Sequence, residues 1–226
     1  FQLSMELYDT KTSKILWSES WQKEWNELAS IKGSLADNIL KSLKVSTKQD
    51  IAKTTTSNSE AYEYYLKAMY KYEKRENMED TEVVRGLLRK AIELDNNLLL
   101  AKNLLGNTFF NSKPNKAIEI YLDNLNEATI IGNNTIVKQS LHNLGLVYRN
   151  IINDYMKSLQ YHLRQLDLCK KIGDHKGSIV ASLDIGNAYY EIGDYENANK
   201  YYLLNYDLAK EMEENEIIFV EVLLYL

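Results

Sequence analysis

The chain has 226 residues, of which 45% are hydrophobic and 26% charged, and its formal net charge is -5 at pH 7. This composition is typical of a globular domain, and the acidic balance provides no basic surface for nucleic acid. No apolar run approaches the roughly 20 residues that a membrane-spanning helix requires. Cys169 is the single cysteine, so an intrachain disulfide is excluded and a hydrophobic core must hold the fold.

The first 22 residues alternate between apolar and polar side chains, which predicts a β-hairpin. A polar, turn-like "DTKT" separates two runs in which alternate positions are apolar. The apolar positions are Phe1, Leu3, Met5, Leu7, Ile15, Trp17 and Trp21. From Leu28 to Leu43 the apolar spacing changes to three and four residues, which predicts a helix.

Residues 46–59 are polar and rich in Ser and Thr, and we interpret them as a linker. The linker ends in "SNSE", Ser57 to Glu60, which has the spacing of a capping box and predicts a helix start. We therefore expect an amino-terminal piece at 1–45, a linker at 46–59 and a helical domain at 60–226. The chain begins and ends within apolar patterns, so we interpret it as part of a longer protein.

From residue 60 onward, one pattern of small and aromatic residues recurs. The stretches "SLHNLGLVYRNIINDYMKSLQYHLRQLDLCKKIGD" and "SLDIGNAYYEIGDYENANKYYLLNYDLAKEMEE" match at offsets of 40 to 42 residues. The matched pairs include Leu141 with Leu183, Gly145 with Gly186, Tyr148 with Tyr189, Ser158 with Ala198, and His162 with Tyr202. Gly106, Ala117 and Tyr121 follow the same plan earlier in the chain.

This pattern resembles the tetratricopeptide repeat over roughly residues 60–226. The resemblance implies a mainly α fold, a right-handed α-solenoid of helical hairpins, with helix pairs near 61–95, 98–131, 135–172 and 176–213. We expect a truncated fifth pair, in which 216–226 is helical and packs back on the 194–213 helix. The repeat glycines should let paired helices approach closely, and "EMEENE" (211–216) should be a solvated turn.

The amino-terminal piece resembles the end of a TolB amino-terminal-like domain. The matching positions are Asp9, Thr12, Leu16, Trp17, Glu19, Trp21, Ile31, Leu35, Ala36 and Ile39. The resemblance implies the carboxyl-terminal part of an α/β domain, which in bacterial class III adenylate/guanylate cyclase-type proteins often precedes tetratricopeptide repeats. Trp17, Trp21 and Trp25 then either close a small core or form an exposed aromatic patch for a partner.

No catalytic constellation is evident in the sequence. Nucleotide-binding glycine loops, zinc-protease and Cys-x-x-Cys motifs are missing. His162 occupies an aromatic repeat position, so we predict a packed core histidine, and Cys169 lies on an apolar stripe that we also assign to the core. His175 follows a turn and should be solvated. We therefore predict that this chain is not an enzyme and has neither a cofactor nor a metal site.

The resemblance implies that the first helix of each hairpin faces a groove that binds a partner. The candidate groove residues are Asn103, Asn107, Phe110, Gln139, His142, Arg149, Asn187 and Tyr190, flanked by Leu146, Val180 and Leu183. In this hypothesis Asn107 and Asn187 bind the backbone of a ligand, Arg149 an acidic group, and Tyr190 provides stacking area. We expect none of these four side chains to be needed for the helix-pair core.

Three functions are compatible with these observations. The first is a regulatory or scaffolding segment of a larger signalling protein, which binds a protein, a peptide or another domain of its own chain. The second is a receptor for a small peptide, and the third a structural module that forms homodimers. We expect no direct contact with nucleic acid or a membrane. The cytoplasm is the expected compartment, with the periplasm as the alternative for a membrane-anchored parent.

Overall fold

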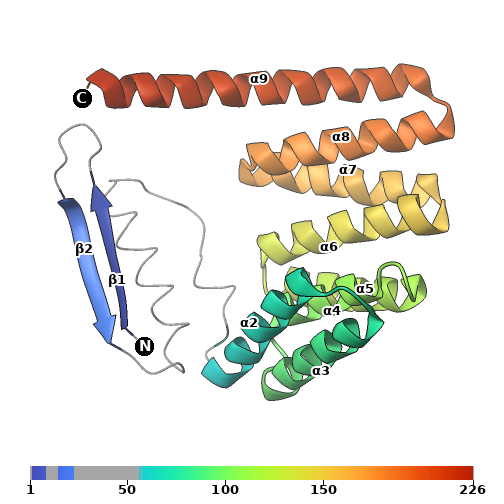
Figure 1. Ribbon diagram of the computed structural model, residues 1–226. Helices are drawn as coiled ribbons and strands as arrows, with labels where there is room; N and C mark the ends of the chain where they lie inside the picture. Colours follow the sequence, from blue (N-terminus) through green and yellow to red (C-terminus); the bar gives the residue numbers. More distant parts are fainter. Residues whose placement is uncertain (1, 9–14, 23–55, 57, 226) are drawn as a thin grey trace. The chain divides into compact units, whose positions relative to one another are not determined.

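The computed structural model describes residues 2–8, 15–22, 56 and 58–225 (Figure 1). The predicted helix at 28–43, Trp25 and nearly all of the 46–59 linker lie outside these residues. The chain divides into two compact units, Phe1–Leu105 and Gly106–Leu226.

In the first unit, strands β1 (Gln2–Tyr8) and β2 (Ile15–Gln22) pair antiparallel. Leu3 lies opposite Trp21 and Leu7 opposite Trp17, so these residues share one parity. On the other parity Ser4 and Ser20 are exposed, and their hydroxyl oxygens lie 2.9 Å apart. The register shifts between Leu7 and Tyr8, and Ile15, which the alternation groups with Trp17, is 53% exposed.

The same unit contains the helices α2 (Ser59–Lys74) and α3 (Met78–Leu94) and most of α4 (Leu99–Phe109). The Asn58 side chain accepts a hydrogen bond from the Ala61 amide and donates to the Leu94 carbonyl (3.0 Å). The helix start predicted from "SNSE" is confirmed, but the capping residue is Asn58, whereas Ser57 lies outside the described residues. The buried residues of this pair include Ala61, Ala68, Val84, Leu88 and Ala91.

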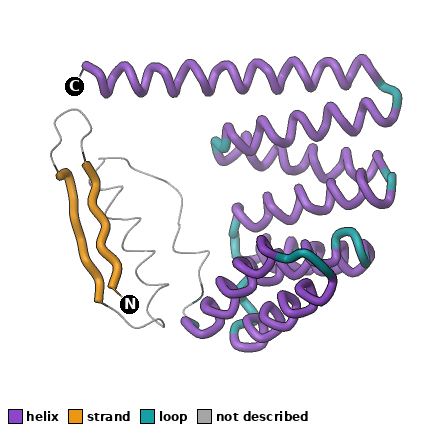
Figure 2. Tube along the Cα trace, in the orientation of Figure 1, coloured by secondary structure: helices purple, strands orange, loops and turns teal. Residues whose placement is uncertain are grey.

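The second unit consists of helices that follow one another in antiparallel order (Figures 1 and 2). They are α5 (Pro114–Ile130), α6 (Asn134–Val147), η3 (Tyr148–Ile152), α7 (Tyr155–Ile172), α8 (His175–Ile192) and α9 (Tyr195–Tyr225). Pro114 occupies the first turn of α5, as predicted, where its missing N–H costs no helical hydrogen bond. The predicted positions of the helix pairs are thus confirmed as far as residue 211.

Three turns between these helices use a glycine in the left-handed region. Gly132, Gly173 and Gly193 have φ values of 70°, 72° and 85°. A side chain is disfavoured in this conformation, so glycine ends these helices at low cost. The side chains of Asn133 and Asp174 then cap the helices that follow.

The predicted turn at "EMEENE" is wrong, because α9 is one continuous helix from Tyr195 to Tyr225. Residues 216–225 are helical, as expected, but they do not fold back on the first part of α9. The physical reason lies in the local sequence. Residues 211–216 contain no glycine of the kind that ends the preceding helices, and glutamate and methionine favour helix.

Three repeat glycines are contact points between paired helices, as predicted. Gly106 faces Tyr121, Gly145 faces His162 and Gly186 faces Tyr202. A Cβ atom on Gly186 would lie 2.5 Å from the Tyr202 ring, which is far inside van der Waals contact. The glycines therefore permit the close approach that places the aromatic residues in the core.

The segment η3 interrupts the regular repeat with one π-helical turn. Six positions separate Tyr148 from Asp154, whereas five separate the equivalent Tyr189 and Asp194. A π-helical turn absorbs one extra residue without breaking a helix. The insertion ends at Asn153, which has φ 60° at the place where the next repeat has Gly193.

Among the helices that the structure describes, none is both long and apolar enough to cross a membrane.

Candidate functional site

The candidate groove residues lie on the first helices of their pairs. Asn103 is on the part of α4 that belongs to the first unit and is buried, whereas Asn107 belongs to the second unit. Gln139 and His142 are on α6, Arg149 is in η3, Asn187 and Tyr190 are on α8, and Phe110 directly follows α4. Of these eight side chains, Tyr190 is the most exposed at 56%.

Asn107 and Asn187 are bound internally. The Tyr121 hydroxyl donates to Asn107 Oδ1 (2.6 Å), and the Tyr202 hydroxyl donates to Asn187 Oδ1 (3.0 Å). Asn143 also donates to Asn107 (3.1 Å). The expectation that these asparagines are not needed for the helix pairs is therefore wrong, because each one satisfies the hydroxyl group of a packed tyrosine.

The middle repeat uses a different pair at the same two positions. It has Leu146 in place of the asparagine, and His162 in place of the tyrosine. His162 is fully buried, which confirms the prediction of a packed core histidine. Since Leu146 offers no side-chain acceptor, a tyrosine hydroxyl would lack the partner that Asn107 and Asn187 provide.

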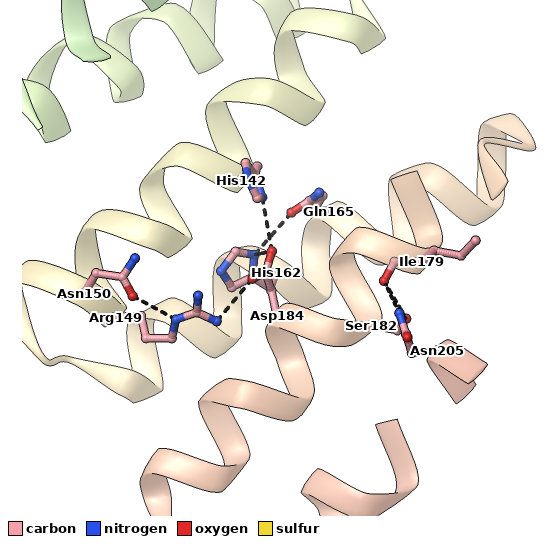
Figure 3. Close-up of polar contacts among 9 residues, drawn as sticks. All are labelled: His142, Arg149, Asn150, His162, Gln165, Ile179, Ser182, Asp184 and Asn205. Carbon is pink, nitrogen blue, oxygen red and sulfur yellow. Dashed lines mark hydrogen bonds and ion pairs between the residues drawn. The ribbon is translucent and has the colours of Figure 1, made fainter. Parts of the chain in front are cut away.

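His162 instead belongs to a polar cluster from three helices (Figure 3). Its Nδ1 lies 3.2 Å from Gln165 Oε1 and 3.8 Å from Asp184 Oδ2. The same Asp184 oxygen lies 3.2 Å from His142 Nδ1, but this pair does not have the geometry of a hydrogen bond. His142 comes from α6, His162 and Gln165 from α7, and Asp184 from α8.

Arg149 holds the other oxygen of the same carboxylate. Its NH1 donates to Asp184 Oδ1 (3.1 Å), and its Nε donates to Asn150 Oδ1 (3.0 Å). The Arg149 side chain is only 16% exposed. The expectation that the helix-pair core does not need Arg149 is therefore also wrong, since this cation neutralises a buried carboxylate.

Burial and charge act in opposite directions on the cluster. Burial lowers the pKa of His162 to about 4, although the carboxylate of Asp184 opposes this shift. His162 is therefore neutral at pH 7, and its approach to Asp184 is not an ion pair. Burial raises the pKa of Asp184, but His142, His162 and Arg149 together bring it below its usual value. Two imidazoles thus face one ionised carboxylate whose side chain is only 9% exposed.

A second feature is an apolar strip on α8. Val180, Leu183 and Tyr190 are 44%, 45% and 56% exposed, and their spacing places them on one face of the helix. The Tyr190 ring contacts Tyr195 edge-on, with centroids 5.4 Å apart. On α6 the equivalent positions one repeat earlier are Gln139 and His142, which are partly exposed.

Sequence reasoning did not find the cluster, although two signals for it exist. One is the histidine at 162 in a position that holds tyrosine in the neighbouring repeats. The other is an amide three residues after each of these aromatic positions: Asn124, Gln165 and Asn205. The amide of Asn205 bonds across to the Ile179 carbonyl (2.6 Å), which shows that this position faces the neighbouring helix.

Residues 137–211 match the family model of the tetratricopeptide repeat. Over this part the chain is similar to tetratricopeptide-repeat proteins. No curated protein matches the sequence.

Solved structures share the arrangement of helices over most of the chain. Aspartyl phosphate phosphatase F from Bacillus subtilis has a TM-score of 0.61 and 18% identity, and the match covers 83% of this chain and 46% of that one. BtubC from P. vanneervenii has the same score, identity and coverage of this chain, and 78% of that chain is covered. A Rap protein complexed with competence and sporulation factor has a TM-score of 0.55 and 13% identity, over 84% of this chain and 56% of that one. At these identities the likeness shows the fold alone.

Proposed function

We propose that the chain is a non-catalytic interaction segment of a larger signalling protein, and that the first-helix face of α6 and α8 binds a protein or peptide segment. The observation that carries this proposal is the apolar strip of Val180, Leu183 and Tyr190 on α8. Exposed apolar residues in a row on one helix favour burial against a partner. Tyrosine is a favourable contact residue, because its large ring is ordered at low entropic cost.

The surroundings of the strip favour a ligand with polar groups at its edge. Gln139 and His142 lie at the equivalent positions of the preceding first helix and are partly exposed. Asn187 lies between Leu183 and Tyr190 and is partly exposed, although its oxygen already accepts the Tyr202 hydroxyl. An extended peptide that packs apolar side chains on the strip would find these polar groups beside its backbone.

The signalling context of this proposal is the cyclase type, and its support is the TolB-like pattern around Trp17 and Trp21. Asn103, Asn107, Phe110 and Arg149 remain secondary candidates for ligand contact. The internal bonds of Asn107 and Arg149 make alanine variants at these two positions poor tests of binding. The sharper test removes the exposed strip.

The test compares two triple variants with the parent. The strip variant, Val180→Ser/Leu183→Ser/Tyr190→Ser, removes the apolar side chains of the α8 strip. The matched control is Met156→Ser/Leu203→Ser/Tyr206→Ser. It removes three apolar side chains of the second helices, which are 58%, 55% and 63% exposed. Circular dichroism checks that all three proteins are folded. We expect the parent and the control to capture the same proteins from a lysate of the source cells, and the strip variant to lose them.

Three other outcomes would contradict the proposal. Parent-like capture by the folded strip variant would move the binding site off this face. A change from dimer to monomer in light scattering, found only for the strip variant and with no captured protein, would favour the dimerisation module. Capture of a small peptide alone, measured by mass spectrometry of the bound fraction, would favour the peptide receptor instead.

A further inference from the structure

We propose that His142, His162 and Asp184 form a binding site for one divalent transition-metal ion of the zinc type. The three side chains come from three successive helices, and one ligand atom of each lies within 4.8 Å of the others. The sequence predicts no metal site, because the residues are far apart along the chain. This inference does not involve the apolar strip, although it shares His142 with the polar edge of the proposed binding face.

The distances fit a tetrahedral ion. Two atoms that are both bound about 2.0–2.1 Å from a tetrahedral zinc ion lie roughly 3.3–3.4 Å apart. Asp184 Oδ2 is 3.2 Å from His142 Nδ1 and 3.8 Å from His162 Nδ1. The first contact is close in length to the edge of a coordination tetrahedron, whereas the second is longer. Because the three ligand atoms lie within 4.8 Å of one another, side-chain rotations would bring them to the distances that an ion requires.

Three buried atoms of the cluster have no hydrogen-bond partner among the described residues, and an ion would bind two of them, but not His162 Nε2. His142 Nδ1 and Asp184 Oδ2 are both buried, and neither has a hydrogen-bond partner among the described residues. The side chains of Asp184 and His162 are 9% and 0% exposed. Buried polar atoms without partners are costly, and neutral imidazole nitrogens and a carboxylate are ligands that zinc prefers.

The surrounding residues provide the remaining parts of a metal site. Gln165 Oε1 lies 3.2 Å from His162 Nδ1 and is placed to become a fourth ligand when that nitrogen binds the ion and the ring proton moves to Nε2. Arg149 orients the carboxylate through its other oxygen. His142 is 30% exposed, so an ion can enter from its side of the cluster.

The repeats themselves suggest a variant that removes a ligand and should keep the packing. His162→Tyr combined with Leu146→Asn recreates the tyrosine–asparagine pair that the neighbouring repeats form at Tyr121–Asn107 and Tyr202–Asn187. Asp184→Asn is the second variant and removes the anionic ligand with little change in shape. His175→Ala removes an exposed histidine outside the cluster and is the control.

The test titrates zinc sulfate into chelator-treated protein by calorimetry and records the absorption of the Co²⁺-loaded protein. We expect one ion per chain in the parent and in the control, and binding weaker by about 100-fold or more in both ligand variants. Zinc should also raise the melting temperature of the parent but not of these variants. Circular dichroism checks that the double variant is folded. If it is not, the zinc affinity of Asp184→Asn relative to the parent tests the proposal. Equal zinc affinity in the parent and the folded ligand variants would overturn the proposal.

Discussion

At the residue scale, the packing of this protein depends on a few positions where a small group meets a large one. Gly186 lies against the Tyr202 ring without room for a methyl group, whereas Gly86 in α3 has no atom within 4 Å of its Cβ position. The two glycines thus have opposite roles, although both lie in the interior of a helix. Only the contacts of the folded chain separate them.

Replacing Gly186 with alanine should lower the free energy of unfolding by about 1–3 kcal/mol, because the added methyl group must displace the ring. Gly86→Ala is the matched control and should raise it by up to about 1 kcal/mol, since alanine is the better helix former. Urea denaturation of the three proteins measures both effects. A Gly186→Ala protein as stable as the parent would show that Tyr202 does not pack here as described.

Cys169 is fully buried, and burial together with the charge of Asp174 raises the pKa of its thiol to about 11. Only the thiolate reacts with alkylating reagents, so the thiol should stay unmodified in the folded protein at pH 8. We expect modification by iodoacetamide to be slow without denaturant and fast above the unfolding midpoint, as measured by intact-mass spectrometry. Rapid modification under native conditions would place Cys169 outside the core.

At the element scale, the repeats tolerate an inserted residue by changing the helix type. The extra residue of the third repeat is accommodated in η3, and the chain then leaves the helix through Asn153 at φ 60°. Asparagine adopts this conformation more readily than other residues with a side chain, but glycine does so without strain. The left-handed residue that ends the helix is therefore kept despite the insertion, whereas the last turn of the helix becomes π-helical.

Asn153→Gly should leave the stability unchanged or raise it slightly, because glycine removes the strain of the left-handed conformation. Asn153→Val should lower the free energy of unfolding by about 1–2 kcal/mol, because a β-branched side chain is poorly tolerated there. Thermal denaturation of the two variants and the parent provides the comparison. If valine were tolerated as well as glycine, the left-handed turn after η3 would be refuted.

At the scale of the whole molecule, α9 is much longer than the helix it pairs with. At about 1.5 Å per residue, the 18 residues of α8 span about 27 Å and the 31 residues of α9 about 46 Å. The contacts of α9 with α8 include Tyr195 with Tyr190, Tyr202 with Asn187 and Asn205 with Ile179. The helix therefore continues well beyond the length that α8 can cover.

A chain shortened to residue 211 should keep its melting temperature within about 2–4 °C, the shift that roughly 1 kcal/mol causes at this size. A chain shortened to residue 197 is the control and should lose much more stability, because the residues that cover α8 are then missing. Differential scanning calorimetry distinguishes the two. A large loss on removal of 212–226 alone would mean that this segment contributes to the core.

The sequence by itself determined where the paired helices lie as far as residue 211, and which glycines they use as contact points. These features depend on apolar spacing, capping residues and small-against-large positions, which are local and recur in each repeat. Tertiary structure alone decided that Asn187 bonds to Tyr202 and that Arg149, His142 and His162 meet at Asp184. The physical reason is that helical periodicity assigns a residue to a face but not to a partner, because partners across helices depend on how the helices are stacked and offset.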